Sequence, residues 1–384
     1  MVERSVLIIG SGLAGYAVAR ELRKLNDTIR MTMLSADHGG FYSKPMLSNA
    51  LTTGKTPDSI LSANAAQMSS QLNAAIRPHT RVVSIDAEGN SVLLENGEKL
   101  PFEQLALALG ADPIRLPLAG EGAQAVLSVN DLDDYRHFRE ALTGKKRIAI
   151  LGAGLIGCEF ANDLAAQGYH VTVFDLSPQP LGRLLPPQAG EFLHDKLATI
   201  GIDFKFNSSI SRIDKHGEQY RLFFGENEFI DAELVLSAIG LKPRIALAEA
   251  AGINVNRGIR VNQYLQTNVS GIYALGDCAE VEGKVLPFIM PITHAGRALS
   301  ATLAGTPTLL HYPAMPVLVK TPACPTVVSP PDPAASGEWE VEISKDGVKA
   351  LYRSETGSLL GFALLGAATA ERGALTAQLP PVMP

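Results

Sequence analysis

Near its N-terminus the chain reads Ser5-Val-Leu-Ile-Ile-Gly10-Ser-Gly12-Leu-Ala-Gly15, and this stretch decides the fold. A β-rich apolar run leads into three glycines spaced Gly-x-Gly-x-x-Gly, and residues 16–25 then carry apolar side chains at helical spacing. The pattern predicts a strand, a tight turn and a helix. The first glycine permits the turn, the second admits a phosphate to the backbone, and the third lets the helix pack on the strand. We therefore expect a dinucleotide whose pyrophosphate binds the free N–H groups at the helix start.

A second copy of the pattern reads Arg147-Ile-Ala-Ile-Leu-Gly152-Ala-Gly154-Leu-Ile-Gly157 and is followed by an apolar helix through Ala166. The strand predicted at 169–175 ends in Asp175, which lies 18 residues past the last glycine. An acid at this spacing accepts hydrogen bonds from a ribose 2′-OH and repels a 2′-phosphate, so NADH is predicted in preference to NADPH. The residues assigned to the pyrophosphate and ribose of NADH are Gly152, Gly154, Gly157 and Asp175.

Composition narrows the class of protein. With 384 residues, 46% of them apolar and 19% charged, the chain is long enough for two or three domains with their own cores. The net charge of −6 argues against a nucleic-acid binder that relies on overall positive charge. No signal peptide and no apolar run of about 20 residues is recognisable, so no membrane association and a cytoplasmic location are expected. Cys158, Cys278 and Cys324 fit neither a disulfide framework nor zinc-ligand spacing, so reduced thiols and no metal site are expected.

A later segment, Thr267-Asn-Val-Ser-Gly271-Ile-Tyr-Ala-Leu-Gly276-Asp277, predicts a short strand that ends in Gly-Asp. With both glycine fingerprints and the segments 105–111 and 234–243, it resembles the two-dinucleotide flavoprotein disulfide reductase superfamily from residue 5 to about 300. The resemblance implies FAD on the first fingerprint, NADH on the second, and Asp277 on the ribityl chain of FAD. It also implies that the chain crosses from the FAD domain to the NAD domain near 105–111 and returns near 234–243.

The expected fold is α/β, with two Rossmann-like dinucleotide-binding domains and a small C-terminal α+β domain. The FAD domain would comprise residues 1–112 and 241–311, the NAD domain 113–240, and the C-terminal domain 312–384. In this tail, which is punctuated by prolines, strands are predicted at 339–343, 348–352 and 359–365, and a short helix near 368–378. A monomer is favoured, because the tail is short and the family includes monomers.

One departure from the disulfide reductases decides the chemistry. They carry a redox-active cysteine pair soon after the first βαβ unit, where this chain reads Gly40-Phe-Tyr-Ser-Lys44-Pro-Met-Leu-Ser-Asn49. Without cysteine in this segment, neither a dithiol nor a sulfenic acid can form there. Electrons brought by NADH must then leave the flavin directly, either to oxygen or to a one-electron acceptor protein.

The segments 42–48 and Val317-Leu-Val-Lys320-Thr-Pro322-Ala-Cys-Pro325 resemble the rubredoxin–NAD reductases of the Pseudomonas type and the related flavorubredoxin reductases. This resemblance covers essentially the whole chain. It implies electron transfer from NADH through FAD to rubredoxin, which commonly serves alkane hydroxylation or oxygen detoxification. Three alternatives stay open: a different iron–sulfur acceptor such as ferredoxin or flavorubredoxin, an NADH oxidase, and an NADH-responsive flavoprotein that signals by conformational change.

Three side chains are predicted to act by charge and position. Lys44 and Lys320 would stabilise the negative charge of a reduced flavin, the surface lysine being the alternative. Glu159 would lie near the nicotinamide–flavin junction and fix the carboxamide, or serve only as an acid in a first helical turn. The residues that the resemblance assigns to FAD are Ile9, Gly10, Ser11, Gly12, Gly15, Leu34, Ser35, Lys44, Val82, Asp277, Ile289 and Lys320.

Some details remain undecided by the sequence. Ser35 stands where FAD binders usually place an acid, and Asp37 comes two residues later, so the Ser35 hydroxyl, nearby backbone and Asp37 are all candidates for the adenosine ribose. A helix is predicted over 293–303 with Thr293 as its N-cap, and His294 is expected to be structural rather than a proton donor.

The expected protein partner sets a further condition. Rubredoxins are typically small and acidic, and this chain is also net acidic. Docking would therefore need a local cationic patch over the flavin edge and a small, transient interface. The candidates for this patch are Arg115, Lys44 and Lys320.

Overall fold

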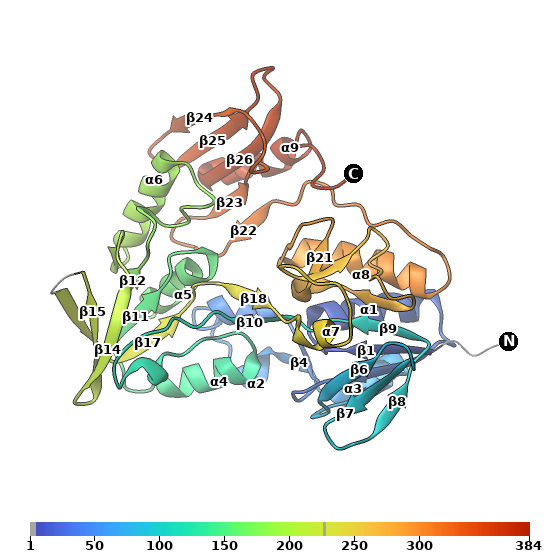
Figure 1. Cartoon of the computed structure of the whole chain (residues 1–384). Helices are drawn as coiled ribbons and strands as arrows, with labels where there is room; N and C mark the ends of the chain where they lie inside the picture. The colour runs from blue at the N-terminus through green and yellow to red at the C-terminus, as the bar shows by residue number, and fades with distance from the viewer. Residues whose placement is uncertain (1–4, 226–227) are drawn as a thin grey trace.

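The computed structural model describes residues 5–225 and 228–384. Two units built on parallel sheets lie side by side, and the C-terminal sheet lies across their junction (Figure 1). This confirms the predicted α/β class with two dinucleotide-binding units and a small C-terminal α+β unit. No helix within the described ranges combines the length and apolar character needed to span a membrane.

The first fingerprint forms the centre of a five-stranded sheet with the order β20-β9-β1-β2-β5, in which all neighbouring strands are parallel. The apolar run of β1 is buried, as expected for a strand covered on both faces. The helix after the glycine turn begins at Leu13, three residues before the predicted start. The elements involved are β1 (Ser5–Ile9), α1 (Leu13–Leu25), β2 (Arg30–Leu34), β5 (Ala75–Arg77), β9 (Gln104–Leu107) and β20 (Ile272–Ala274).

Helix α8 (Ile289–Leu303) packs against α1 at very close range. The Ser300 hydroxyl donates a hydrogen bond of 3.0 Å to the carbonyl of Val18, and a Cβ added at Gly296 would lie 2.9 Å from that of Ala17. The prediction that Thr293 caps this helix is wrong. The helix starts four residues earlier after Phe288, and the Thr293 hydroxyl donates to the carbonyl of Ile289 inside the helix.

The second fingerprint builds a four-stranded parallel sheet with the order β13-β12-β11-β17. The two crossing segments pair with each other as the antiparallel ribbon β10–β18, which runs between the two units (Figure 1). This ribbon lies at the predicted domain limits 112/113 and 240/241, which stay a prediction. The elements are β10 (Ala111–Pro113), β11 (Arg147–Leu151), α5 (Leu155–Ala165), β12 (His170–Phe174), α6 (Pro187–Ala198), β13 (Ile202–Lys205), β17 (Leu234–Ser237) and β18 (Leu241–Pro243).

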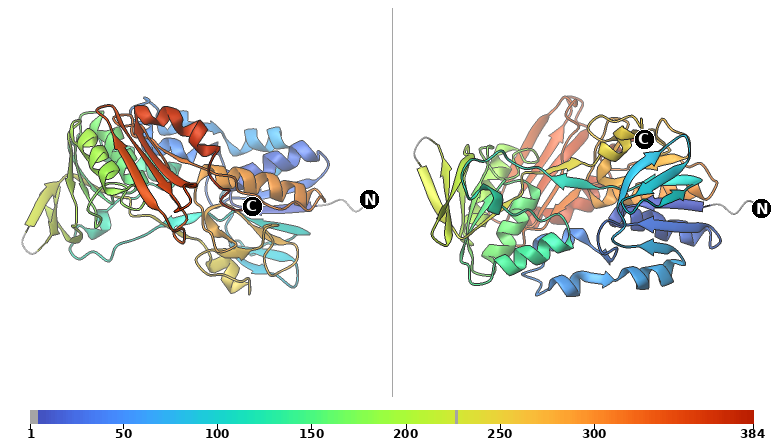
Figure 2. Two further views of the ribbon diagram at one scale, coloured as in Figure 1. Left: turned by 90° about the horizontal axis from the view of Figure 1, so that it is seen from above. Right: turned by 60° about the horizontal axis from the view of Figure 1, so that its bottom comes forward.

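Each of the two units also carries a small antiparallel sheet of three strands. The sheet β14-β15-β16 projects from the outer end of the NAD unit, and β6-β7-β8 lies on the FAD unit (Figure 2). Their strands are β6 (Val82–Asp86), β7 (Ser91–Leu94), β8 (Lys99–Pro101), β14 (Ile210–His216), β15 (Gln219–Phe224) and β16 (Glu228–Ala232). The remaining elements of the two units are β3 (Phe41–Tyr42), η1 (Lys44–Asn49), α2 (Pro57–Ile60), β4 (Leu61–Ala63), α3 (Ala65–Leu72), η2 (Ala123–Ala125), α4 (Leu132–Ala141), α7 (Ala246–Ala250), β19 (Ile259–Val261), η3 (Gly276–Cys278) and β21 (Ala279–Val281).

The C-terminal unit is a five-stranded antiparallel sheet with the order β22-β23-β26-β25-β24. The three predicted strands are present, but β22 and β23 were missed, and the predicted helix is a 3-10 turn followed by a five-residue α-helix. Backbone hydrogen bonds of 2.8 and 3.0 Å join Tyr312 to Met383, so both ends of this unit meet on the FAD unit. The elements are β22 (Val317–Val319), β23 (Thr326–Ser329), β24 (Glu338–Ile343), β25 (Gly347–Arg353), β26 (Leu359–Gly366), η4 (Ala367–Glu371) and α9 (Arg372–Thr376).

Replacing Gly296 by leucine is expected to destabilise the protein by about 1–3 kcal/mol, because the side chain would overpack the contact between α8 and α1. The measurement is the thermal midpoint of the FAD-loaded protein. Gly373→Ala is the control, since no described atom outside the local backbone of α9 lies within 4 Å of the added Cβ at that position. An unchanged midpoint for Gly296→Leu would contradict the close helix packing.

Candidate active site

The first glycine loop has the shape of a pyrophosphate cradle. Gly10 has φ of +110°, and an added Cβ would lie 2.1 Å from the carbonyl oxygen of Ala108. A Cβ at Gly15 would lie 1.9 Å from the carbonyl oxygen of Gly10. Gly12, by contrast, is exposed, and apart from its chain neighbours no described residue has an atom within 4 Å of its added Cβ. Gly12 is also the N-cap of α1, where no side chain of the described residues caps the first N–H groups. The free donors and open space fit the pyrophosphate of FAD.

The ends of β1 and β2 complete this loop. Ile9 and Leu34 are buried, and the Leu34 carbonyl accepts a 2.8 Å hydrogen bond from the Gly10 N–H. The Ser11 and Ser35 hydroxyls lie 2.5 Å apart, and both donate to Oδ1 of Asp37. The Asp37 carboxylate therefore lies beside Ser35, the position at which the sequence led us to expect an acid.

The environment of Asp37 favours its charged form. Burial raises the pKa of this carboxyl, but hydrogen bonds from Ser35, the Gly39 N–H and Ser11 more than offset it and hold the pKa below its usual value. The geometry favours Asp37 among the three candidates for the adenosine ribose, with the two serines orienting it. This assignment remains a proposal.

Asp277 and Lys44 meet close to the first turn of α1. A Cβ added at Gly276 would lie 2.7 Å from that of Ala14, so Asp277 follows a residue packed on the first turn of α1. The Lys44 Nζ lies 4.0 Å from Oδ2 of Asp277. Burial lowers the pKa of Lys44 and raises the pKa of Asp277, and their mutual attraction opposes both shifts.

Three other residues that the sequence predicts for FAD or the flavin edge lie at the start of an element or just after one. Val82 is the first residue of β6 and is half-buried against the core of the FAD unit. Ile289 is the first residue of α8 and its side chain is exposed. Arg115 is exposed in the segment after β10.

The second glycine loop repeats the geometry of the first. Gly152 has φ of +105°, and a Cβ at Gly157 would lie 1.8 Å from the Gly152 carbonyl oxygen. Gly154 is the exposed N-cap of α5, and apart from its chain neighbours no described residue has an atom within 4 Å of its added Cβ. Asp175 accepts hydrogen bonds from the N–H groups of Ala153 at 2.5 Å and Ser177 at 2.7 Å. The carboxylate is therefore fixed at the rim of the loop that fits the NADH pyrophosphate.

Glu159, in the first two turns of α5, connects all three units. Its side chain is fully buried. Oε2 accepts a 2.5 Å hydrogen bond from the Ser48 hydroxyl and pairs with Nζ of Lys320, while Oε1 accepts a 2.9 Å hydrogen bond from the Lys320 N–H. Ser48 belongs to η1 of the FAD unit and Lys320 to the C-terminal unit. The structure thus brings Glu159 and Lys320 together, whereas the carboxamide contact of Glu159 stays a prediction.

The next turn of α5 extends this connection. Asn162 and Asp163 are both almost completely buried. Oδ1 of Asn162 accepts from the N–H of Ala323, and the Asp163 carboxylate accepts from the N–H groups of Leu51 and Thr52 at 3.0 and 2.8 Å. One helix of the NAD unit therefore binds backbone of both other units.

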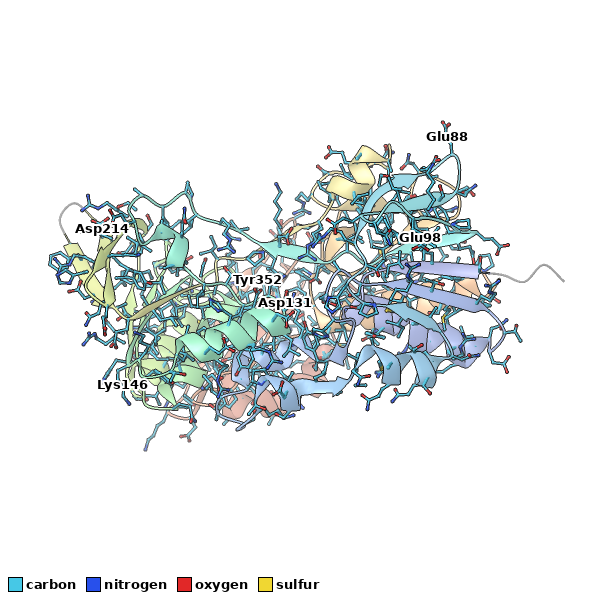
Figure 3. The ribbon with its side chains drawn as sticks, turned by 90° about the horizontal axis from the view of Figure 1, so that it is seen from below. Glu88, Glu98, Asp131, Lys146, Asp214 and Tyr352 are labelled. Carbon is cyan, nitrogen blue, oxygen red and sulfur yellow. The ribbon has the colours of Figure 1, made fainter. Side chains whose placement is uncertain are left out.

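Asn130 makes a further contact between the NAD unit and the FAD unit. Its Oδ1 accepts a 2.7 Å hydrogen bond from Nζ of Lys44. Asn130 directly precedes Asp131, which is the N-cap of α4. Figure 3 shows Asp131 near the middle of the molecule. Lys146 and Asp214 lie far from it on the NAD unit (Figure 3). Sequence reasoning missed Ser48, Asn130 and Asp163, because no motif marks them and their contacts span 86 to 112 residues.

The three cysteines are free and buried. Burial raises the pKa of all three thiols, that of Cys278 to about 11, so they are poor nucleophiles near neutral pH. Burial and the nearby Arg297 lower the pKa of His294, so its ring is neutral near neutral pH.

Comparisons with known proteins agree with this architecture. The pyridine nucleotide-disulphide oxidoreductase family matches residues 4–300, and the rubredoxin binding C-terminal domain matches residues 309–379. A rubredoxin-NAD(+) reductase from Acinetobacter baylyi is 47% identical over 99% of this chain and 98% of its own length. Another from Alcanivorax borkumensis is 46% identical over 99% of both chains. The crystal structure of a ferredoxin reductase from Rhodopseudomonas palustris superposes with a TM-score of 0.88 at 27% identity, covering 98% of this chain and 95% of that one.

The fold and the two cradles define a two-dinucleotide oxidoreductase. The chain belongs to the pyridine nucleotide-disulphide oxidoreductase family, and its full-length likeness groups it with the relatives named rubredoxin-NAD(+) reductase. The resemblance seen in the sequence is confirmed, as are FAD and NADH as the cofactor and the substrate that the family implies.

Asp175→Ala is expected to weaken NADH binding about 10- to 100-fold, because hydrogen bonds to a charged group contribute about 1.5–3 kcal/mol. FAD content should stay unchanged, since Asp175 lies on the second loop. The measurements are the NADH dissociation constant and the flavin absorbance. Asp203→Ala is the matched control, because this acid is exposed on the neighbouring strand β13. Unchanged NADH affinity in Asp175→Ala would exclude the ribose contact.

Lys320→Met is expected to destabilise the protein by about 3–5 kcal/mol, because it leaves the Glu159 carboxylate buried without its cation. The double variant Glu159→Gln/Lys320→Met should recover much of this loss. Thermal unfolding of the wild type, Glu159→Gln, Lys320→Met and the double variant measures the coupling. Arg353→Met, which breaks an exposed pair with Glu340, should change little. A double variant as unstable as Lys320→Met would contradict the coupling.

Proposed function

We propose that this protein oxidises NADH and passes the electrons through FAD to rubredoxin. One observation carries the proposal: the buried Glu159 of the NAD unit binds Lys320 of the C-terminal unit and Ser48 of the FAD unit. The unit that matches the rubredoxin binding domain is therefore fixed to both dinucleotide-binding units. The curated relatives named rubredoxin-NAD(+) reductase support the same acceptor.

The chain's own residues bind and orient the two dinucleotides. When bound, FAD accepts a hydride from NADH and releases the two electrons singly. The N–H groups behind Gly12 and Gly154 bind the two pyrophosphates, and Asp175 selects a ribose without a 2′-phosphate. Asp277 binds the ribityl chain, and Lys44 beside it places positive charge at the flavin end of the cradle.

The protein offers its electrons no route through sulfur. The segment 40–49 contains no cysteine, and the three thiols of the chain are buried with raised pKa values. A direct transfer from the flavin edge to a docked protein is the remaining route that uses a rubredoxin-binding unit. Exposed Arg115 and the partly exposed Lys44 are candidates for the cationic side of that docking surface.

The cellular setting belongs to the same proposal. We place the protein in the cytoplasm, as a monomer, in an electron-transport chain such as one that supplies alkane hydroxylation. Three free thiols support a reducing compartment, and the NADH-specific loop supports a role fed by a cytoplasmic coenzyme pool. The acceptor chemistry itself is independent of this setting.

The test is anaerobic mixing of the FAD-loaded protein with NADH and then with oxidised rubredoxin, with flavin and rubredoxin bleaching followed separately. Ferredoxin and air serve as alternative acceptors. We expect rubredoxin to bleach much faster than either alternative responds. If the flavin bleaches and rubredoxin does not, the NADH half stands and the acceptor is wrong. Rapid oxygen consumption without a protein acceptor would instead identify an NADH oxidase.

A further inference from the structure

Asn130 holds the ammonium of Lys44 from across the junction of the two dinucleotide units. The Lys44 Nζ donates a 2.7 Å hydrogen bond to Oδ1 of Asn130, although the residues lie 86 positions apart. Asn130 is only 7% exposed, whereas the Lys44 side chain is 37% exposed. The buried amide therefore fixes the charged end of a side chain that is otherwise partly in solvent.

The orientation of this amide is set by a second contact. Nδ2 of Asn130 donates a 2.9 Å hydrogen bond to the carbonyl of Ala111, which begins the ribbon between the two units. Its backbone N–H donates to Oδ2 of Asp134 at 2.9 Å. Because a carbonyl can only accept, the amide nitrogen must face Ala111, and the amide oxygen must face Lys44.

We propose that Asn130 is a positioning residue that holds the Lys44 ammonium in place, directed at the flavin site. The inference rests on the proposed function of Lys44 toward FAD. A neutral amide oxygen binds the ammonium without cancelling its charge, whereas a carboxylate would form an ion pair. Without Asn130, the Asp277 carboxylate, now 4.0 Å away, is the nearest anion toward which Lys44 would turn.

The consequence concerns the flavin potential. A positive charge near the flavin favours the reduced, more negative form of the cofactor and raises its potential. Asn130→Ala releases the ammonium toward Asp277, and Asn130→Asp places a carboxylate beside the ammonium, although it loses the donation to the Ala111 carbonyl. Both changes should shift the potential to more negative values, in the same direction as Lys44→Met.

The experiment compares flavin midpoint potentials in the FAD-loaded wild type, Lys44→Met, Asn130→Ala and the double variant. We expect both single variants to shift negative and the double variant to shift no further than Lys44→Met alone. Arg136→Ala is the matched control, because its 2.8 Å contact with Asp58 also joins α4 to the FAD unit but lies on the exposed surface. The control should keep the wild-type potential.

The failures of the two proposals are distinguishable. An unchanged potential in Lys44→Met would overturn the role of Lys44 and, with it, that of Asn130. A shift in Lys44→Met without one in Asn130→Ala would overturn the positioning role alone. So would additive shifts in the double variant. If Asn130→Ala does not retain FAD, Asn130→Asp replaces it in the test, because it keeps the size of the side chain even though it loses the donation to the Ala111 carbonyl. A wild-type potential in Asn130→Asp would equally refute the inference.

Discussion

The buried carboxylate of Glu159 is the constraint on which the arrangement of the three units depends. Removing a carboxylate from water costs several kcal/mol, and this cost is offset only by a well-placed cation and further hydrogen bonds. Both come from other units, from Lys320 and Ser48. Asn162 and Asp163 bind backbone of the same two segments one turn later. The C-terminal unit therefore cannot separate from α5 without stranding charge and polar groups, which makes it part of the reductase core.

What the sequence predicts well is local. Gly10 has a positive φ, and the close approach of Ala108 leaves no room for a Cβ at this position. Only glycine satisfies both conditions, so the glycine pattern by itself predicts the turn. The same holds for Gly152 and for Asp175, which ends the next strand. These features depend on neighbours within one βαβ unit, and the pattern can be recognised without knowledge of the rest of the chain.

What the sequence hides depends on topology or on short elements. Ser48 and Asn130 are ordinary polar residues until the fold brings them to Glu159 and Lys44, 111 and 86 positions away. The short strands β22 and β23 were missed because the prolines around them favoured a loop. In the structure, β23 is nevertheless a buried inner strand of its sheet. The predicted start of helix α8 was too late for a similar reason. Pro291 suggested that the helix begins after it, yet proline is tolerated in a first helical turn.

Two lysines reach the junction from different units, and they differ in whether the partner of the ammonium is charged or neutral. Lys320 binds a fully buried carboxylate, so most of its charge serves to neutralise Glu159. Lys44 binds a neutral amide at 2.7 Å and an acid only at 4.0 Å, so more of its charge remains directed at the cradle. On the proposed function, Lys320 then acts chiefly by holding the rubredoxin-binding unit in place, and Lys44 chiefly by setting the flavin potential. The sequence analysis gave both lysines the same expected role toward the reduced flavin, and the different contacts of the two ammonium groups now separate their roles.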